Sequence, residues 1–207
     1  MDLIPAGRRR LKTDRLTLEP ASTEHLEHLV NLNSDADVMR FILGRAATQD
    51  ETVAEWEKRL GPQSDESRGL GYWVGFAGED FVGWWSASSF ADDRSQPGIG
   101  YRLMRAAWGL SLATEGGLAM INLAFAAPDV EKAVASTMAT NTASRRVLEK
   151  LGMRHVGTYV GQWRDALPGW ENGEAVYERT AAMRSNRLID PDGLIRPRDR
   201  DTDEDRS

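Results

Sequence analysis

The stretch NTASRRVLEKLG, residues 141–152, combines a polar helix start, an amphipathic turn and a glycine stop. Asn141 or Thr142 can accept a hydrogen bond from a free amide of the first turn, and Gly152 can supply a left-handed C-cap. The stretch therefore predicts a short, sharply bounded helix. Its apolar residues share one face at helical spacing: Ala143, Val147, Leu148 and Leu151. Ser144 has no structural task in this pattern, which makes it a candidate for chemistry.

The length of the chain, 207 residues, suits one sizeable core. No linker rich in Pro, Gly and Ser divides it. The sequence therefore predicts a flexible N-terminus over residues 1–10, a single domain over residues 11–183 and a charged tail over residues 184–207. The tail mixes Arg, Asp, Glu and Pro with few apolar side chains, and we expect it to be disordered.

Composition excludes several classes of protein. No apolar run could span a bilayer and the start lacks the apolar stretch of a secretory signal, so we expect a cytoplasmic protein without a membrane partner. The chain has no cysteine, which removes a thiolate nucleophile and a disulfide framework. Its three histidines are too scattered to predict a metal site. A net charge of -6 argues against direct nucleic-acid binding.

Hydrophobic periodicity predicts alternating helices and strands. Expected helices are 23–33, 35–43, 48–60 and 110–125, and expected strands are 11–20, 72–77, 81–90, 99–104, 133–138, 155–160 and 174–182. Gly78-Glu79-Asp80 suits a hairpin turn between two of these strands. The order indicates an α/β (α+β) sheet in which the central β-α-β crossover makes two strands parallel.

The predicted helix 110–125 has an apolar inner face and a glycine pair. The inner face comprises Leu110, Ala113, Met120, Ile121 and Ala124. Gly116 and Gly117 weaken the helix locally and indicate close packing.

The run Trp108-Gly109-Leu110-Ser111-Leu112-Ala113 follows a predicted strand directly. Unpaired amides and the helix dipole at such a start attract anions, and Gly109 would let a phosphate approach the backbone closely. Plain packing of small residues is the alternative explanation of this run.

Five ordered segments carry a family resemblance. They are TDRLTL (13–18), DVMRFI (37–42), IGY (99–101), WGLSLATE (108–115) and the 141–152 stretch. Together they resemble the GNAT N-acetyltransferases, and within that family the Rim-type branch, named for enzymes that acetylate N-termini of ribosomal proteins. The resemblance covers about residues 11–182.

The resemblance implies a GNAT-type three-layer fold. Its central sheet would be mixed and mostly antiparallel, with two central parallel strands splayed to hold acyl-CoA and helices on both faces. Acetyl-CoA would be the acyl donor, with its pyrophosphate on the amides of residues 109–113 and its pantetheine arm between the strands of Tyr101 and Ser136. The implied cofactor-binding residues are Tyr101, Arg102, Leu103, Trp108, Gly109, Leu110, Ser111, Leu112, Ala113, Thr114, Asn141, Ser144 and Arg146.

The implied activity is an acyltransferase of the EC 2.3.1 type, in which a primary amine attacks the thioester directly. A strand amide within residues 99–102 would polarise the carbonyl, Asn141 would hold the cofactor arm and Ser144 would protonate the leaving thiolate. The absence of Cys agrees with a route that has no acyl-enzyme. For Ser144 the alternative role is that of a second helix-cap hydroxyl.

Two departures from the family pattern affect these expectations. Ser111 replaces the second glycine of the phosphate loop, and we expect it to tolerate a helical backbone while narrowing the space above the phosphates. Relatives often carry Glu just before Ile-Gly-Tyr, where this chain has Pro97-Gly98. Candidate replacements for that general base are Glu174, Asp165 and Glu171, each of which could equally be a solvated charge. An amine of pKa near 8 is already partly neutral and could react without a base.

Tryptophans gather in the segments expected around the acceptor: Trp73, Trp84, Trp85, Trp163 and Trp170. Alternation predicts that Trp84 and Trp85 face opposite sides of the sheet, one in the core and one along a cleft. An aromatic, acidic entrance would suit a cationic amine. The acceptor is expected to be a protein N-terminus or a small-molecule amine, and the protein a monomer or homodimer. The alternative is a catalytically weak or inactive acyl-CoA-binding module.

Overall fold

The computed structural model describes residues 8–61, 65–89, 93–161, 167–181, 187–189 and 195–197. The α-helices are α1 (Leu26–Asn33), α2 (Ala36–Met39), α3 (Gln49–Leu60), α4 (Leu112–Ala126) and α5 (Thr142–Lys150). Single 3-10 turns are η1 (Thr23–His25), η2 (Glu66–Arg68), η3 (Arg105–Ala107) and η4 (Trp170–Asn172). The strands are β1 (Leu11–Lys12), β2 (Thr17–Pro20), β3 (Gly71–Ala77), β4 (Asp80–Ser89), β5 (Pro97–Leu103), β6 (Lys132–Met138), β7 (Arg154–Tyr159), β8 (Glu174–Thr180), β9 (Arg187–Ile189) and β10 (Ile195–Pro197).

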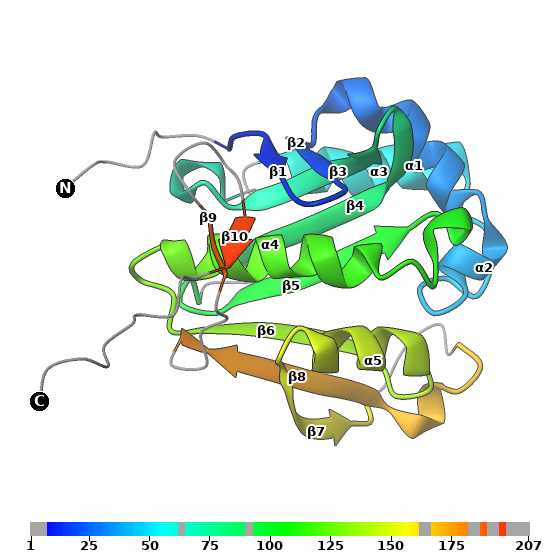
Figure 1. Ribbon diagram of the computed structural model, residues 1–207. Helices are drawn as coiled ribbons and strands as arrows, with labels where there is room; N and C mark the ends of the chain where they lie inside the picture. The colour runs from blue at the N-terminus through cyan, green and yellow to red at the C-terminus, as the bar shows by residue number, and fades with distance from the viewer. Residues whose placement is uncertain are drawn as a thin grey trace, which may run out of the picture.

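Eight strands form one sheet in the order β1-β2-β3-β4-β5-β6-β8-β7. All neighbours are antiparallel except β5 and β6, which are parallel and pair only at Gly98 and Val134. Beyond that pair the two strands diverge, and the gap between them is visible in Figure 1. The predicted mixed, mostly antiparallel sheet with two splayed central parallel strands is confirmed.

Helices cover both faces of this sheet. On one face α4 packs against β4 and β5, and α5 packs against β6 and β7 (Figure 1). On the other face α1 contacts β4 and α3 contacts β3. Each face has its own apolar cluster, one beneath α4 and one beneath α1 and α3. The three-layer arrangement implied by the resemblance is therefore present.

Trp84 and Trp85 occupy opposite faces of β4, as alternation predicts. Trp85 is fully buried beneath α4, where its indole N–H donates to the carbonyl of Ala113 at 3.2 Å. A Cβ on Gly116 would lie 2.4 Å from the Trp85 ring, and one on Gly117 would lie 2.9 Å from Leu151. The predicted close packing of the glycine pair is confirmed, because only hydrogen at these positions lets α4 approach its neighbours.

The predicted strand 11–20 is wrong as a continuous element. β1 and β2 instead form a hairpin in which Leu11 opposes Leu18. The Thr13 amide donates to the carbonyl of Leu16 at 2.9 Å, and the Leu16 amide donates back to the Thr13 hydroxyl at 2.9 Å. A threonine hydroxyl that bonds the backbone locally offers the chain a turn in place of a strand.

Two helix boundaries also differ from the prediction. α4 begins at Leu112, so Leu110 lies in the preceding turn with 53% of its surface exposed and is not part of the inner face. α2 ends at Met39, whose carbonyl accepts from the amides of residues 42, 43 and 44 in a tight turn. Gly44 closes this turn with φ of 71°.

Two segments of the C-terminal tail are described. β9 and β10 pair antiparallel, with Arg187 opposite Pro197, and β9 lies against α4. The rest of residues 184–207 lies outside the described part of the chain, and so do residues 1–7. Within the described residues, no helix has the length and apolar character needed to cross a membrane.

Candidate active site

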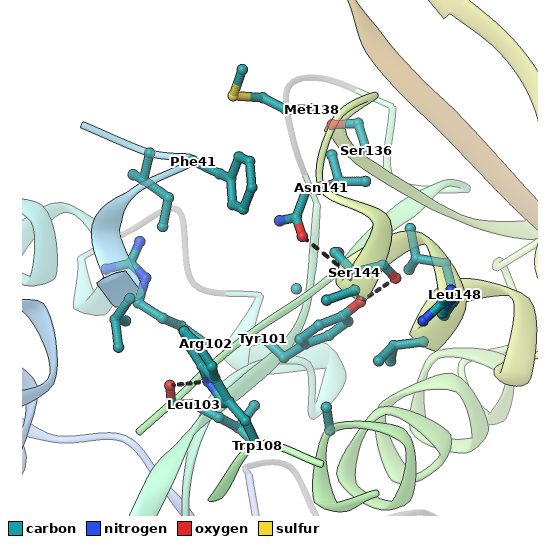
Figure 2. A pocket seen from close by; sticks show the side chains of 18 of the residues that line it. Phe41, Tyr101, Arg102, Leu103, Trp108, Ser136, Met138, Asn141, Ser144 and Leu148 are labelled. Atoms are coloured by element: carbon teal, nitrogen blue, oxygen red, sulfur yellow. Dashed lines mark hydrogen bonds between the residues drawn. The ribbon is translucent and has the colours of Figure 1, made fainter. Parts of the chain in front are cut away.

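A cavity of about 800 Å³ opens where β5 and β6 diverge. Its walls come from β5 and β6, the loop before α4, the first turns of α4 and α5, the turn after α2 and the start of β8. Figure 2 shows Phe41 on one side of this cavity, across from Asn141 and Ser144. The single parallel pair therefore creates a space at the place where the family resemblance implies acyl-CoA.

The loop before α4 forms one end of the cavity with two left-handed residues. Gly109 has φ of 74° and Ser111 has φ of 62°. A Cβ on Gly109 would meet no atom within 4 Å, so the backbone there is open to close approach. Residues of this loop and of the first turn of α4 line the cavity, and the first amides of a helix have no partner within the helix, so this end of the cavity offers donors that suit a pyrophosphate.

The expectation that Ser111 has a helical backbone is wrong. In the described part of the chain it is the only non-glycine residue with a positive φ, and it stands at the N-cap of α4 without a side-chain cap bond. A left-handed conformation brings Cβ close to the following carbonyl, which costs about 1 kcal/mol for residues other than glycine.

Ser111→Gly is therefore expected to raise the free energy of unfolding by about 1 kcal/mol, since glycine carries no such strain. Urea denaturation of both proteins measures the difference. Gly109→Ala is the matched control: its Cβ meets open space, so strain of the same backbone region should lower stability. Equal stability of Ser111→Gly and the parent protein would contradict strain at this position.

The start of α5 confirms the predicted caps. The Asn141 side-chain oxygen accepts from the Ser144 amide at 3.1 Å, and the Asn141 amide nitrogen points into the cavity (Figure 2). Gly152 follows the helix with φ of 71°. Asn141 thus fixes the first turn of α5 while keeping a donor available to a ligand.

Ser144 is paired with a tyrosine from β5. The Tyr101 hydroxyl lies 3.0 Å from the Ser144 hydroxyl and 3.1 Å from the Ser144 carbonyl oxygen (Figure 2). Burial raises the pKa of Tyr101 to about 12, although the hydrogen bond to Ser144 opposes that shift. The phenol therefore stays protonated at neutral pH, and the two hydroxyls form a proton-bearing pair at the cavity wall.

A carboxylate faces the same cavity from the start of β8. The Ser136 hydroxyl on β6 donates to Glu174 Oε1 at 2.6 Å, and both residues line the cavity. Glu171, the other described candidate for a base, is exposed and does not line it. The third candidate, Asp165, lies outside the described residues, as does Trp163.

Most residues predicted to bind the cofactor come together here. Those that line the cavity are Tyr101, Arg102, Leu103, Trp108, Gly109, Ser111, Leu112, Ala113, Thr114, Asn141, Ser144 and Arg146. Leu110 is not among them, because its side chain points to solvent. The Arg102 guanidinium turns to the other face of the sheet, where it donates to Asn33 Oδ1 at 2.6 Å and to Glu55. Only the backbone of Arg102 therefore remains for a ligand.

The residues after α2 were not predicted to form part of the site. Phe41 and Ile42 line the cavity, and Leu167 and Trp170 join them from the segment before β8. A Cβ on Gly44 would lie 3.0 Å from Leu167, so the two segments are in contact. The apolar end of the DVMRFI motif was the available signal, but sequence alone does not reveal which distant segment it meets.

Comparison with known proteins assigns the family. The Acetyltransferase (GNAT) domain family matches residues 15–154 of this chain. The FsC-acetyl coenzyme A-N(2)-transacetylase of Aspergillus fumigatus is 35% identical over 180 residues, covering 82% of this chain and 75% of that protein.

Solved structures show the same fold. RimL, described as a ribosomal L7/L12 α-N-protein acetyltransferase in complex with coenzyme A, is 17% identical with a TM-score of 0.71 over 85% of this chain and 100% of that one. A GNAT-family acetyltransferase from Bacillus anthracis is 21% identical with a TM-score of 0.68 over 83% of this chain and 98% of that one. Taken with the cavity, these matches show that the chain belongs to the GNAT acetyltransferase family, as an acyl-CoA N-acetyltransferase whose acyl donor is acetyl-CoA.

Proposed function

We propose that the protein acetylates a primary amine that carries one ammonium group next to an apolar substituent, either a protein N-terminus or a small molecule. The observation that carries this proposal is the cavity itself, which is lined by Phe41, Ile42, Leu167 and Trp170 on the acceptor side and also by Glu174. The name of the fungal relative, an N(2)-transacetylase, supports nitrogen as the acceptor atom. The 13–18 motif and the RimL fold match support placement in the Rim-type branch.

Charge in the cavity favours a single ammonium. Two carboxylates line it on the acceptor side, Asp37 and Glu174. Asp37 is already paired, since Arg105 donates to it at 2.6 Å. Glu174 accepts from the Ser136 hydroxyl and forms no ion pair with the described residues, so it can pair with an incoming cation. Among the described residues of the cavity, one carboxylate without an ion pair matches one ammonium and leaves further positive charges of a polyamine without a partner.

The thioester of acetyl-CoA supplies a reactive acetyl group, and residues of the cavity position it for attack by the amine. Residues of β5 beyond Gly98 do not pair with β6, so their amides facing the gap can polarise the acyl carbonyl. Glu174 accepts a proton from the ammonium, directly or through water, which frees the nitrogen lone pair. As the C–N bond forms and the C–S bond breaks, the Tyr101 and Ser144 pair donates a proton to the sulfur, and the second proton that the nitrogen loses returns to this pair through water. The products are an amide and a free thiol.

Turnover on an amine panel tests the proposal. We expect 2-phenylethylamine and a peptide with an N-terminal methionine to be acetylated with kcat/KM about tenfold above spermidine, because apolar burial adds affinity while extra cations add none. Thiol release measures each rate, and calorimetry measures acetyl-CoA binding separately. Preference for spermidine would contradict the acceptor class, and binding without turnover on any amine would indicate a binding module.

A further inference from the structure

The β1–β2 turn reaches the phosphate-side loop through a cluster of hydrogen bonds. The carboxylate of Glu115, in the first turn of α4, accepts from the Thr13 hydroxyl at 2.5 Å and from the Arg15 amide at 2.8 Å. It also accepts from Arg15 Nε at 2.8 Å and forms an ion pair with Arg15 Nη2 at 2.7 Å. The Arg15 guanidinium donates in addition to the Leu110 carbonyl at 2.9 Å. One arginine therefore connects the hairpin to both the helix and the loop.

The bond to Leu110 fixes a peptide plane. In a trans peptide the carbonyl and the following N–H point in opposite directions. Because the Leu110 carbonyl is directed at Arg15, the Ser111 N–H is directed the other way, and Ser111 lines the cavity while Leu110 does not. Arg15 thereby also holds the residue that adopts the left-handed conformation.

The bonds to Glu115 neutralise a charge at an unfavourable place for an anion. Glu115 lies in the first helical turn next to the cavity-lining Thr114, and its side chain is only 10% exposed. A free carboxylate there would repel phosphate through low-dielectric surroundings. Thr13 and Arg15 donate hydrogen bonds to the two carboxylate oxygens of Glu115, which orient this carboxylate toward the β1–β2 hairpin.

We infer that Arg15, supported by Thr13, is a positioning residue for the donor: it orients the Leu110–Ser111 peptide and masks Glu115 so that the loop amides can bind the pyrophosphate of acetyl-CoA. This inference rests on the proposed placement of the pyrophosphate on the amides of residues 109–113. Arg15 itself is half-exposed and does not line the cavity, but it bonds Leu110 and Glu115, so it acts through them.

Kinetics with two acyl donors, acetyl-CoA and S-acetylpantetheine, distinguish this role from simple structural support. Arg15→Ala is expected to raise KM for acetyl-CoA about tenfold with kcat nearly unchanged, and to leave kcat/KM for S-acetylpantetheine, which has no pyrophosphate, within about twofold. Arg15→Lys should recover little, because an ammonium cannot donate to Leu110 and Glu115 in the arginine's fork geometry. Thr13→Val, which keeps the side-chain volume, should raise KM for acetyl-CoA in the same selective way.

Arg10→Ala is the control, since it removes an ion pair with Glu19 from the same hairpin without touching α4. Arg10→Ala should leave KM for acetyl-CoA and kcat/KM for S-acetylpantetheine unchanged. Equal losses with both donors, or no loss with either in both the Arg15→Ala and Thr13→Val proteins, would overturn the inference. A parent enzyme that turns over both donors equally well would instead refute the pyrophosphate placement itself.

Discussion

Glu174→Gln should lower kcat for acetyl transfer to a primary amine by about 100-fold or more at neutral pH, because the ammonium then loses the group that takes its proton. Glutamine keeps the size of the side chain and can still accept from the Ser136 hydroxyl, so acetyl-CoA affinity should stay within about twofold. Thiol release gives kcat, and calorimetry gives the affinity.

The deficit of this variant should also shrink as pH rises. Above its own pKa an amine is already neutral, and a base no longer contributes. The matched control is Glu171→Gln, three residues away, exposed and outside the cavity lining, which should retain full activity. A Glu174→Gln enzyme as active as the parent at neutral pH would remove Glu174 from the mechanism.

Ser144→Ala is expected to lower kcat roughly thirtyfold while leaving acetyl-CoA affinity nearly intact, because the leaving sulfur loses a proton donor that acts late in the reaction. The loss should be smaller than for Glu174→Gln, since the Tyr101 hydroxyl, 3.0 Å from Ser144 Oγ, still supplies a proton nearby. Ser144→Ala combined with Tyr101→Phe should therefore be slower than either single variant.

The pH profile provides an independent check on this pair. Burial raises the pKa of Tyr101 to about 12, so the phenol stays protonated and no loss of the acid is expected below about pH 10. Thr142→Ala removes a hydroxyl from the same helix outside the cavity lining and should leave kcat unchanged. An unaltered kcat for Ser144→Ala would leave Ser144 as a cap residue alone.

Local pattern predicted most of the architecture. Helical periodicity and the Asn141 and Gly152 caps were sufficient for α5, and the order of elements was sufficient for the parallel pair. The β1–β2 hairpin escaped prediction because its turn depends on one threonine hydroxyl rather than on a glycine or proline. The left-handed Ser111 escaped it because serine rarely adopts that conformation, and here a bond from Arg15 to Leu110 holds the adjoining peptide.

The two ends of the site differed in how far they could be predicted. The donor end is built from contiguous motifs, and their residues do line the cavity. The acceptor end forms where the turn after α2 meets Leu167, a contact between segments more than a hundred residues apart. The pairing of Ser136 with Glu174 likewise depends on β6 lying beside β8, which follows from sheet order and not from spacing along the chain.

The lone parallel rung at Gly98 and Val134 has a thermodynamic consequence. Because β5 and β6 diverge beyond this pair, backbone groups along their facing edges lack the hydrogen bonds that fully paired strands would make. A molecule bound in that gap can form hydrogen bonds with those backbone groups, and it can do so only in the native state. The free energy of unfolding therefore rises with the free concentration of that molecule. Acetyl-CoA bound between β5 and β6 would therefore stabilise the folded protein as well as serve as its substrate.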